Sequence, residues 1–199
     1  MCDERLVGAA TSNSAFDLSS ATAVAGGATI AYVATGHNFP DALSAAPAAA
    51  SIDGPVVLVP GLAGSVDAAT IDLLDDLGIE TVKIVGSAMA VSAGVEAGLD
   101  SQFDVVRLQG ANRYGTAIAV NLDAFDTAPT VYLATGENFP DALAGAARAG
   151  YEGRPLFISQ QQCIPTAIMD AITTLNPGRI VLLGGTPALS TRVEDLETC

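Results

Sequence analysis

The chain contains few of the side chains on which most catalytic and nucleic-acid-binding sites depend. Its 199 residues include one lysine (Lys83), one histidine (His37) and no tryptophan, and 22 acidic side chains outnumber 8 basic ones. A formal net charge of -14 would repel DNA, RNA and anionic lipid headgroups over a Debye length of about 8–10 Å. We therefore expect no nucleic-acid partner, and so acidic a surface suits an extracellular or high-salt setting.

Several motifs that would indicate an enzyme are missing as well. The sequence has no G-x-G-x-x-G or G-x-x-x-x-G-K-[ST] loop for nucleotide phosphates, no G-x-S-x-G nucleophile turn and no D-x-D pair. One histidine and no C-x-x-C leave no set of zinc ligands. We therefore expect no catalytic residue, no metal and no cofactor.

No stretch is long and apolar enough to predict a transmembrane helix, which needs about 20 predominantly apolar residues. The longest uncharged run, residues 18–40, is interrupted by glycines, serines and His37. No basic segment followed by an apolar one opens the chain, but secretion stays open because Met1 can follow a removed leader. We expect no membrane insertion.

A ten-residue sequence occurs twice, 100 residues apart. Residues 34–43 read ATGHNFPDAL and residues 134–143 read ATGENFPDAL, so the two copies differ only at His37 and Glu137. Each copy follows a short apolar run and precedes an alanine-rich segment, which indicates a turn between a strand and a helix. Because the histidine is not repeated, a catalytic role shared by both copies is disfavoured.

The two halves of the chain repeat the same order of predicted elements. Apolar runs alternate with helical segments, which predicts βαβ units, mostly parallel sheets and right-handed crossovers. We therefore expect an α/β fold of two tandem modules, residues 1–103 and 104–199, each a mostly parallel sheet flanked by helices, packed against each other. The predicted strands are a short one that opens the first module and residues 29–34, 55–59, 81–85, 104–108, 130–134, 155–159 and 179–183, and a weak helix is predicted over residues 13–25.

The repeated turn carries three polar side chains in each copy. A glycine permits close approach of other groups, a proline suits the first helical position, and the aspartate after it complements the helix dipole. These residues can serve the fold alone, or they can line a polar pocket at the edge of the sheet. The candidate binding residues from the turn are Thr35, Asn38, Asp41, Thr135, Asn138 and Asp141.

A cluster of basic and aromatic residues, Arg107, Arg113 and Tyr114, begins the second module. The pair Arg113 and Tyr114 has no counterpart in the first module. In so acidic a chain, Arg113 either pairs with Glu137 or Asp141 within the fold, or its fork-shaped guanidinium binds a phosphate or carboxylate. All three cluster residues are candidates for ligand binding.

The chain has three cysteines, Cys2, Cys163 and Cys199. A disulfide between Cys163 and Cys199 would close the last segment of the chain and stabilise it by roughly 3–4 kcal/mol in the chain-entropy model. Two separate buried thiols are the alternative, which we favour less because a terminal cysteine is a poor core residue. A disulfide would also indicate an extracellular location. Cys2 has no assigned role.

The repeated parts, taken together, resemble the cell wall binding repeat 2 family, the surface-anchoring modules of secreted microbial proteins. The resemblance rests on R-L-x-G-A-x-R-Y-x-T-A at the start of the second module, on A-T-G-x-N-F-P-D-A-L and on the proline-led strand, and it covers nearly the whole chain. It implies Toprim-like modules, usually three in tandem, that attach to anionic cell-wall polymers in the groove between modules. It also adds Pro55, Leu58, Pro155 and Ile158 to the candidate binding residues.

The chain departs from the family pattern in two ways. The first module lacks the arginine and tyrosine of R-Y-x-T-A, so a site built on them exists once, and only two modules are present. The three-module assembly is then truncated, replaced by a dimeric arrangement or completed by self-association. Because the chain is acidic, binding to an anionic polymer would need divalent cations that bridge carboxylates to the polymer, or the local arginines Arg107, Arg113, Arg148 and Arg154.

These expectations describe a non-catalytic, secreted protein of the cell wall or cell surface whose partner is a secondary wall polymer or polysaccharide. The first alternative is a self-assembling surface or structural protein, which would form homo-oligomers. The second and less favoured alternative is an extracellular hydrolase of wall polymers.

Overall fold

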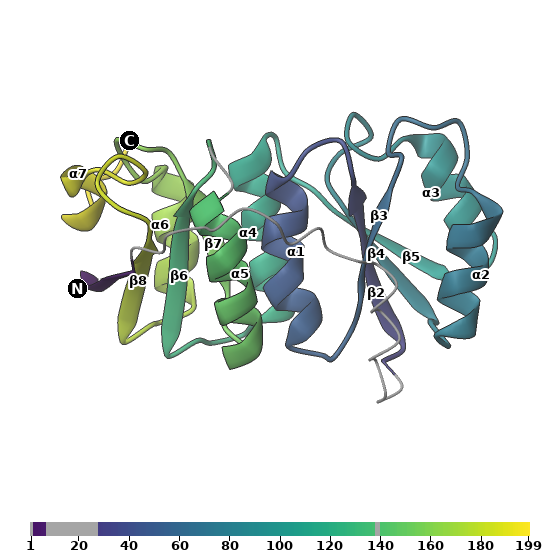
Figure 1. Cartoon of the computed structure of the whole chain (residues 1–199), viewed down its shortest axis with the longest axis horizontal. Helices are drawn as coiled ribbons and strands as arrows, with labels where there is room; N and C mark the ends of the chain where they lie inside the picture. Colours follow the sequence, from purple (N-terminus) through teal and green to yellow (C-terminus); the bar gives the residue numbers. More distant parts are fainter. Residues whose placement is uncertain (1, 7–27, 138–139) are drawn as a thin grey trace.

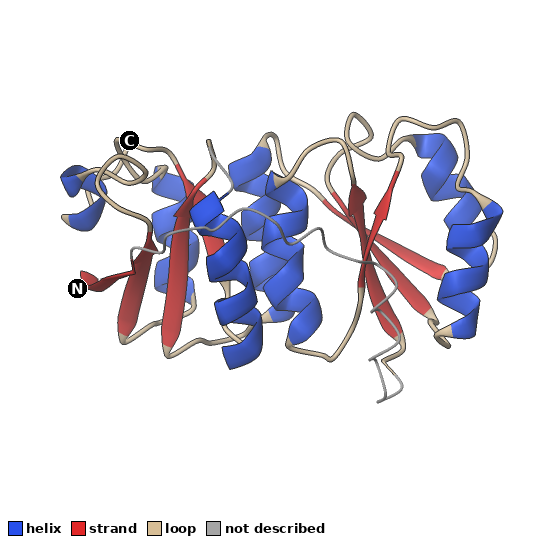
Figure 2. Cartoon of the chain, viewed as in Figure 1, coloured by secondary structure: helices blue, strands red, loops and turns tan. Residues whose placement is uncertain are grey.

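The computed structural model describes residues 2–6, 28–137 and 140–199 and contains two four-stranded sheets (Figures 1 and 2). Three helices, α1, α4 and α5, lie between the sheets. Helices α2 and α3 lie on the outer side of the first sheet, and α6 and α7 lie beside the second. The helix bounds are α1 Pro40–Ala50, α2 Ala68–Asp76, α3 Ala93–Asp100, α4 Arg113–Ala124, α5 Pro140–Glu152, α6 Thr166–Thr174 and α7 Thr191–Glu194.

Every strand pair of the two sheets is parallel, as the alternation of elements predicts. The first sheet has the order β3-β2-β4-β5 and the second has the order β1-β8-β6-β7. The predicted strands are found with ends shifted by at most one residue, and the helix predicted over residues 13–25 lies outside the described residues. The strand bounds are β1 Cys2–Leu6, β2 Ile30–Thr35, β3 Val56–Val59, β4 Thr81–Val85, β5 Asp104–Leu108, β6 Thr130–Thr135, β7 Leu156–Ser159 and β8 Arg179–Leu183.

The two repeats exchange their first strands. β5 opens the second repeat in the sequence, yet it pairs with β4 of the first repeat, from Thr81 opposite Asp104 to Val85 opposite Leu108. β1 opens the first repeat and pairs with β8 of the second. Each sheet therefore contains three strands of one repeat and one strand of the other. The boundary after residue 103 stays a prediction, and β1 and β5 each pair with a strand on its other side.

Helix starts follow local capping residues. Oδ1 of Asp67 accepts a hydrogen bond from the N–H of Thr70 at 2.7 Å, and the hydroxyl of Ser92 accepts one from Val95 at 3.2 Å. The side chain of Asn112 caps α4 in the same way. Such caps satisfy N–H groups that have no partner within the helix.

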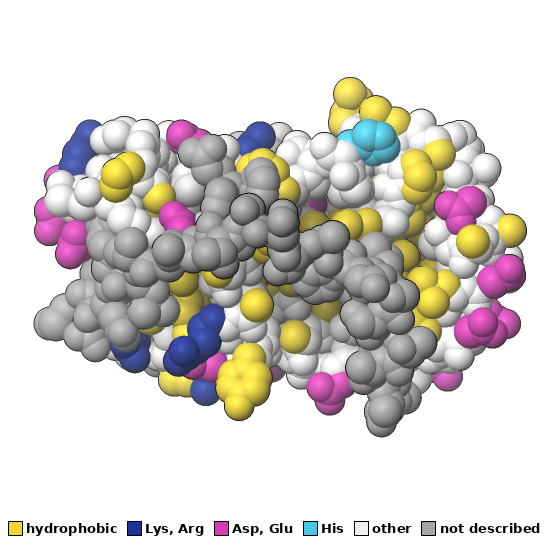
Figure 3. Space-filling model, viewed as in Figure 1, with side chains coloured by type: hydrophobic (Ala, Val, Ile, Leu, Met, Phe, Trp, Pro, Cys, Tyr) yellow, Lys and Arg dark blue, Asp and Glu magenta, His cyan; other side chains and the backbone are white. Residues whose placement is uncertain are grey.

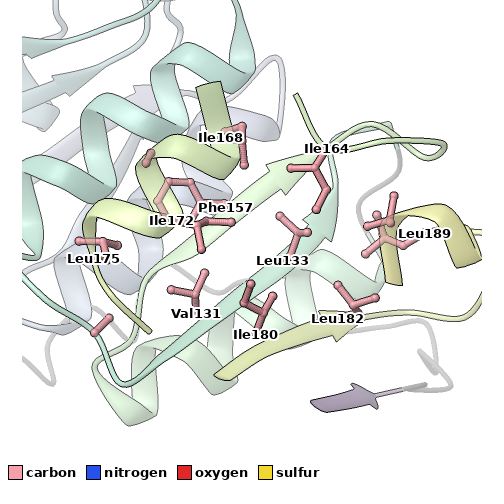
Figure 4. Packing of buried hydrophobic residues seen from close by; sticks show 13 residues of the cluster. Val131, Leu133, Phe157, Ile164, Ile168, Ile172, Leu175, Ile180, Leu182 and Leu189 are labelled. Carbon is pink, nitrogen blue, oxygen red and sulfur yellow. The ribbon is translucent and has the colours of Figure 1, made fainter. Parts of the chain in front are cut away.

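The outer core of each sheet is built from large aliphatic side chains. Between the second sheet and α6, Leu133 and Phe157 pack with Ile168 and Ile172, all fully buried (Figure 4). Burial of each such side chain contributes about 1.5–3 kcal/mol. Such packing fixes the position of the strands that the repeated turns follow.

The inner contact between the repeats uses small residues instead. A Cβ on Gly150 of α5 would lie 3.0 Å from Cβ of Ala50 in α1. The high alanine and glycine content of the repeated helices therefore permits α1 and α5 to pack closely side by side. This packing brings the two repeated turns to the same end of the molecule (Figure 1).

Candidate functional site

The repeated turn follows an inner strand in each sheet, β2 in the first and β6 in the second. The hydroxyl of Thr35 accepts a hydrogen bond from the N–H of His37 at 3.2 Å, and the hydroxyl of Thr135 accepts the same bond from Glu137 at 3.2 Å. Both threonines are buried. Their shared role is to hold the turn, and this role needs no ligand.

The aspartates of the two turns pack against glycines that follow β4 and β8. A Cβ on Gly86 would lie 2.5 Å from Oδ2 of Asp41, and a Cβ on Gly184 would lie 2.5 Å from Oδ2 of Asp141. Both glycines have a positive φ, 105° and 102°, which favours glycine. Sequence reasoning missed these two partners of the motif, although a glycine follows the last strand of each repeat and could have indicated them.

A polar cleft of about 170 Å³ lies between the first turn of α1 and the start of α4. Asp41 lines it from the first repeat and Arg113 lines it from the second. Burial raises the pKa of Asp41, and the positive charge of Arg113 acts against that rise. The cleft therefore combines one guanidinium with a carboxyl group whose pKa lies above its ordinary value. The other lining residues are Asn38, Pro40, Ser87, Ala90, Gly110, Ala111, Asn112 and Thr116.

The polar cleft also holds the N-terminal turn of α4. Oδ1 of Asn112 accepts hydrogen bonds from the N–H groups of Tyr114 and Gly115, both at 3.0 Å. The starts of α1 and α4 both face this region, and helix N-termini carry partial positive charge. The geometry favours a negatively charged or strongly polar ligand.

Arg113 and Tyr114 also reach the turn of the second repeat. The guanidinium of Arg113 donates a hydrogen bond to the carbonyl oxygen of Gly136. Among the described residues its hydrogen-bond acceptor is thus a backbone carbonyl, and the predicted pairing with a carboxylate is not the contact observed. A Cβ on Gly136 would lie 3.2 Å from Cε1 of Tyr114 and 3.4 Å from Cδ1 of Ile158. The Arg113–Tyr114 pair therefore covers this turn, with Ile158 fully buried beside it.

The equivalent place in the first repeat is an apolar cleft of about 390 Å³. Leu58 lines it and is 41% exposed, whereas its equivalent Ile158 is fully buried. Leu143 of α5 lines it from the second repeat, so this cleft also lies between the repeats. Asn38 lines both clefts, which therefore adjoin. The remaining lining residues are Thr35, Gly36, His37, Phe39, Ala42, Leu43, Ala46, Val56 and Ala146.

Arg107 holds the loop after β4, which lines the polar cleft. Its Nε and one terminal nitrogen donate to the carboxylate of Glu96 at 3.1 and 2.9 Å. The terminal nitrogens also donate to the carbonyl oxygens of Gly86 at 2.7 Å and Val91 at 3.0 Å. With its donors engaged and 11% of its side chain exposed, Arg107 fastens the loop after β4, which forms one wall of the cleft.

The predicted binding residues of the proline-led strands differ in burial, and most of them are buried. Pro55 and Pro155 are buried, and their carbonyl oxygens accept hydrogen bonds from the N–H groups of Tyr32 and Tyr132 at 2.9 and 3.0 Å. Asn138 lies outside the described residues. Of the four residues predicted on the proline-led strands, Leu58 is the one exposed in a cleft.

The predicted disulfide between Cys163 and Cys199 is present, with the two Cα atoms 5.7 Å apart. The carbonyl oxygen of Cys199 accepts hydrogen bonds from the N–H and the hydroxyl of Thr166, both at 3.0 Å. The chain end is thus fastened to the start of α6. The side chain of Cys2 lies outside the described part of the structure.

The described residues form neither a group of metal ligands nor a membrane-spanning helix. Within residues 2–6, 28–137 and 140–199, no three His, Cys, Asp or Glu side chains are grouped so that they could hold a metal ion. No helix in the described part of the chain is long and apolar enough to cross a membrane.

The family model of cell wall binding domain 2 matches the chain twice in tandem, over residues 8–96 and 107–194. The chain belongs to this family. It is therefore a pair of cell-wall-binding modules, and the resemblance seen in the repeated motifs is confirmed.

Two relatives come from Bacillus subtilis (strain 168). The N-acetylmuramoyl-L-alanine amidase LytC is 30% identical over 179 residues, which are 89% of this chain and 35% of the amidase. The amidase enhancer is 28% identical over 166 residues, which are 83% of this chain and 22% of that protein. Because the match covers about a third of the amidase or less, the amidase activity is not transferred to this chain.

Two solved structures have a similar fold. Cwp6 from Clostridium difficile gives a TM-score of 0.78 at 20% identity and matches 98% of this chain and 31% of that chain. Cwp8 from Clostridium difficile gives a TM-score of 0.71 at 25% identity, over 84% of this chain and 29% of that chain. The likeness supports parallel sheets flanked by helices as the architecture of this family, and the Toprim-like classification stays a prediction.

Proposed function

We propose that this pair of cell-wall-binding modules attaches its protein non-covalently to an anionic secondary polymer of the cell wall, across the polar and apolar clefts. The observation that carries the proposal is that the two clefts adjoin at Asn38 and lie between the repeats. Both are lined by the repeated turn, the most specific sequence feature of the chain. Such attachment would hold the protein at the cell surface.

The two clefts supply complementary chemistry for such a polymer. The bond to Gly136 uses one of the five N–H donors of the Arg113 guanidinium. The group therefore retains donors for the fork-shaped contact that phosphates and carboxylates favour. The apolar cleft, with Leu58 and Leu143 at its sides, suits the less polar face of a sugar ring.

The charge distribution favours the second repeat as the anion-binding side. Residues 1–103 contain 12 acidic and 2 basic side chains, whereas residues 104–199 contain 10 acidic and 6 basic ones. A polyanion is therefore repelled less by the second repeat, where Arg113 lies. The residues aligned with Arg113 and Tyr114 in the first repeat are Thr11 and Ser12, so we propose one arginine cleft in each chain.

Arg113→Ala tests the polar cleft. We expect about tenfold weaker binding to isolated walls, because a charge-assisted contact is lost. Loss of the bond to Gly136 should lower the free energy of unfolding by only about 1 kcal/mol. The measurements are sedimentation of the protein with purified walls and its urea unfolding curve.

Two controls make this experiment decisive. Arg192→Ala removes an exposed positive charge that pairs with Glu197, and it should leave wall binding unchanged. Walls stripped of their secondary polymers should retain neither the wild type nor the variants. Equal retention of Arg113→Ala and wild type on intact walls would remove Arg113 from the site. Retention of the wild type on stripped walls at the level seen with intact walls would refute the polymer as partner.

A further inference from the structure

The far end of α5 carries a second basic and aromatic surface, formed by Arg148, Tyr151 and Arg154 and called here the α5-end surface. Tyr151 is 92% exposed, the largest value among the exposed large hydrophobic side chains of the described residues. The side chain of Arg148 is 58% exposed. Figure 3 shows basic and hydrophobic atoms next to one another at the lower edge of the molecule. An aromatic ring so fully in water has both faces free for a ligand.

Neighbouring groups hold this surface in place. Glu152 accepts a hydrogen bond from the phenol of Tyr132 at 2.6 Å and another from Nε of Arg148 at 2.6 Å. These bonds, with the charge of Arg154 nearby, hold the pKa of Glu152 below its ordinary value. The backbone N–H of Arg154 donates to the carbonyl oxygen of Ala149 at 2.8 Å, which closes the helix end. Two arginines and one carboxylate leave this surface positive in a strongly acidic chain.

The first repeat shows that the fold does not need these side chains. At the positions of Arg148, Tyr151 and Arg154 it has Ala48, Ser51 and Gly54. The equivalent hydrogen bond is still formed, because the N–H of Gly54 donates to the carbonyl oxygen of Ala49 at 2.8 Å, although α1 ends at Ala50 and α5 at Glu152. The backbone is thus formed equally well without the arginines and the tyrosine. The usual explanation for such residues, that they shape the helix end, does not account for them here.

We propose that the α5-end surface is a second contact for an anionic sugar polymer. The ring of Tyr151 stacks on a pyranose face, and Arg148 and Arg154 bind phosphate or carboxylate groups of neighbouring units. The inference rests on the proposed function, since it concerns the same class of polymer. Helix α5 has 13 residues and is about 20 Å long. The apolar cleft contacts it at Leu143 and Ala146, so the α5-end surface lies beyond the clefts, toward the C-terminal end of the helix. A long polymer that reaches both contacts gains affinity through effective concentration.

The test compares matched single variants on two purified polymers. Polygalacturonate offers carboxylates on pyranose rings, and polyglycerol phosphate offers phosphates without a sugar ring in its backbone. Arg148→Ala and Arg192→Ala form a matched pair, because the two side chains are 58% and 56% exposed and each pairs with a glutamate. Tyr151→Ser introduces the residue that the first repeat has at this position.

We expect Tyr151→Ser to weaken binding to polygalacturonate about tenfold and to leave polyglycerol phosphate binding unchanged, because stacking needs a ring. Arg148→Ala should weaken binding to both polymers about threefold, and Arg192→Ala should weaken neither. If Tyr151→Ser and Arg148→Ala bind both polymers and intact walls as the wild type does, the α5-end surface is not a polymer contact. That result leaves the proposed function standing, whereas a wild type that intact walls do not retain refutes the proposed function itself.

Discussion

At the scale of single residues, identical positions of the two repeats have acquired different surroundings. Thr35 and Thr135 make the same hydrogen bond in both turns. Asp41 and Asp141 pack on equivalent glycines, but only Asp41 shares a described cleft with Arg113. The repeated residues therefore build the turn twice, and the proposed anion site lies at the turn that contains Asp41.

The raised pKa of Asp41 predicts that polymer binding strengthens as the pH falls. Burial favours the protonated carboxyl group, although Arg113 opposes this. Protonation removes the negative charge beside Arg113, so retention on walls should rise as the pH falls through the folded-state pKa. Asp41→Asn should bind more tightly than wild type at neutral pH and should lose this part of the pH dependence. The measurement is wall sedimentation across a pH series.

The raised pKa of Asp41 also makes the free energy of unfolding depend on pH. Because the folded-state pKa lies above that of the unfolded chain, folding is progressively penalised as the pH rises through the interval between them, and the penalty is complete above the folded-state pKa. Asp141→Asn is the matched control, since it removes the same charge from the equivalent turn. A pH profile of Asp41→Asn that coincides with that of the wild type would contradict this role of Asp41.

At the scale of elements, α4 connects the two sheets and carries the arginine. Asn121 is fully buried, and its side-chain amide donates to the carbonyl oxygens of Ala117 and Leu156, both at 2.8 Å. This ties the body of α4 to β7 while its first turn faces α1. Because the body of α4 is fixed by this buried contact and the Arg113 guanidinium donates to the carbonyl oxygen of Gly136, the side chain of Arg113 is held in place without a ligand.

The disulfide is the element-scale feature that should affect stability without affecting binding. It joins residues 36 positions apart and fastens the chain end to the start of α6. Cys163→Ala with Cys199→Ala should lower the free energy of unfolding by roughly 3–4 kcal/mol. Urea unfolding, with reduced wild type as the comparison, measures the loss. Wall retention well below the unfolding midpoint should stay unchanged, and a parallel loss of retention would show that the bridge supports the clefts.

At the scale of the whole molecule, the strand exchange completes the two four-stranded sheets. Each repeat donates its first strand to the other, so β5 covers β4 and β1 covers β8. The β8 segment that β1 covers includes Ile180, Leu182 and Leu183, all buried. The two modules are therefore joined by backbone hydrogen bonds as well as by helix packing.

Removal of residues 1–6 tests this exchange. Without β1, the edge of β8 loses its parallel partner, and exposed edge strands pair with other chains. We expect the free energy of unfolding to fall by a few kcal/mol, on the order of 1 kcal/mol for each lost backbone bond, and the protein to associate. Light scattering after size exclusion measures the association. An unchanged monomer with unchanged stability would contradict the β1–β8 pairing.

Much of the fold was predictable because its signals are local. The repeated motif, the strand-helix alternation and the cap at Asn112 all depend on residues within a few positions of one another. The disulfide was also predictable, because the terminal Cys199 is a poor core residue and Cys163 was its favoured partner. The family followed from the motif itself.

Only the tertiary structure decided which candidates lie at a surface. Arg107 resembles a ligand-binding residue in the sequence, yet its donors are engaged by Glu96 and by backbone carbonyls. Leu58 and Ile158 occupy the same position of the repeat, but they differ in burial. Ile158 is buried beside the turn that Tyr114 contacts, whereas Leu58 is exposed in the open apolar cleft. The exchange of first strands between the repeats could not be predicted from the sequence either. Local sequence determines that a segment forms a strand or a capped helix, whereas the choice among equivalent partners depends on packing energies between residues distant in the chain.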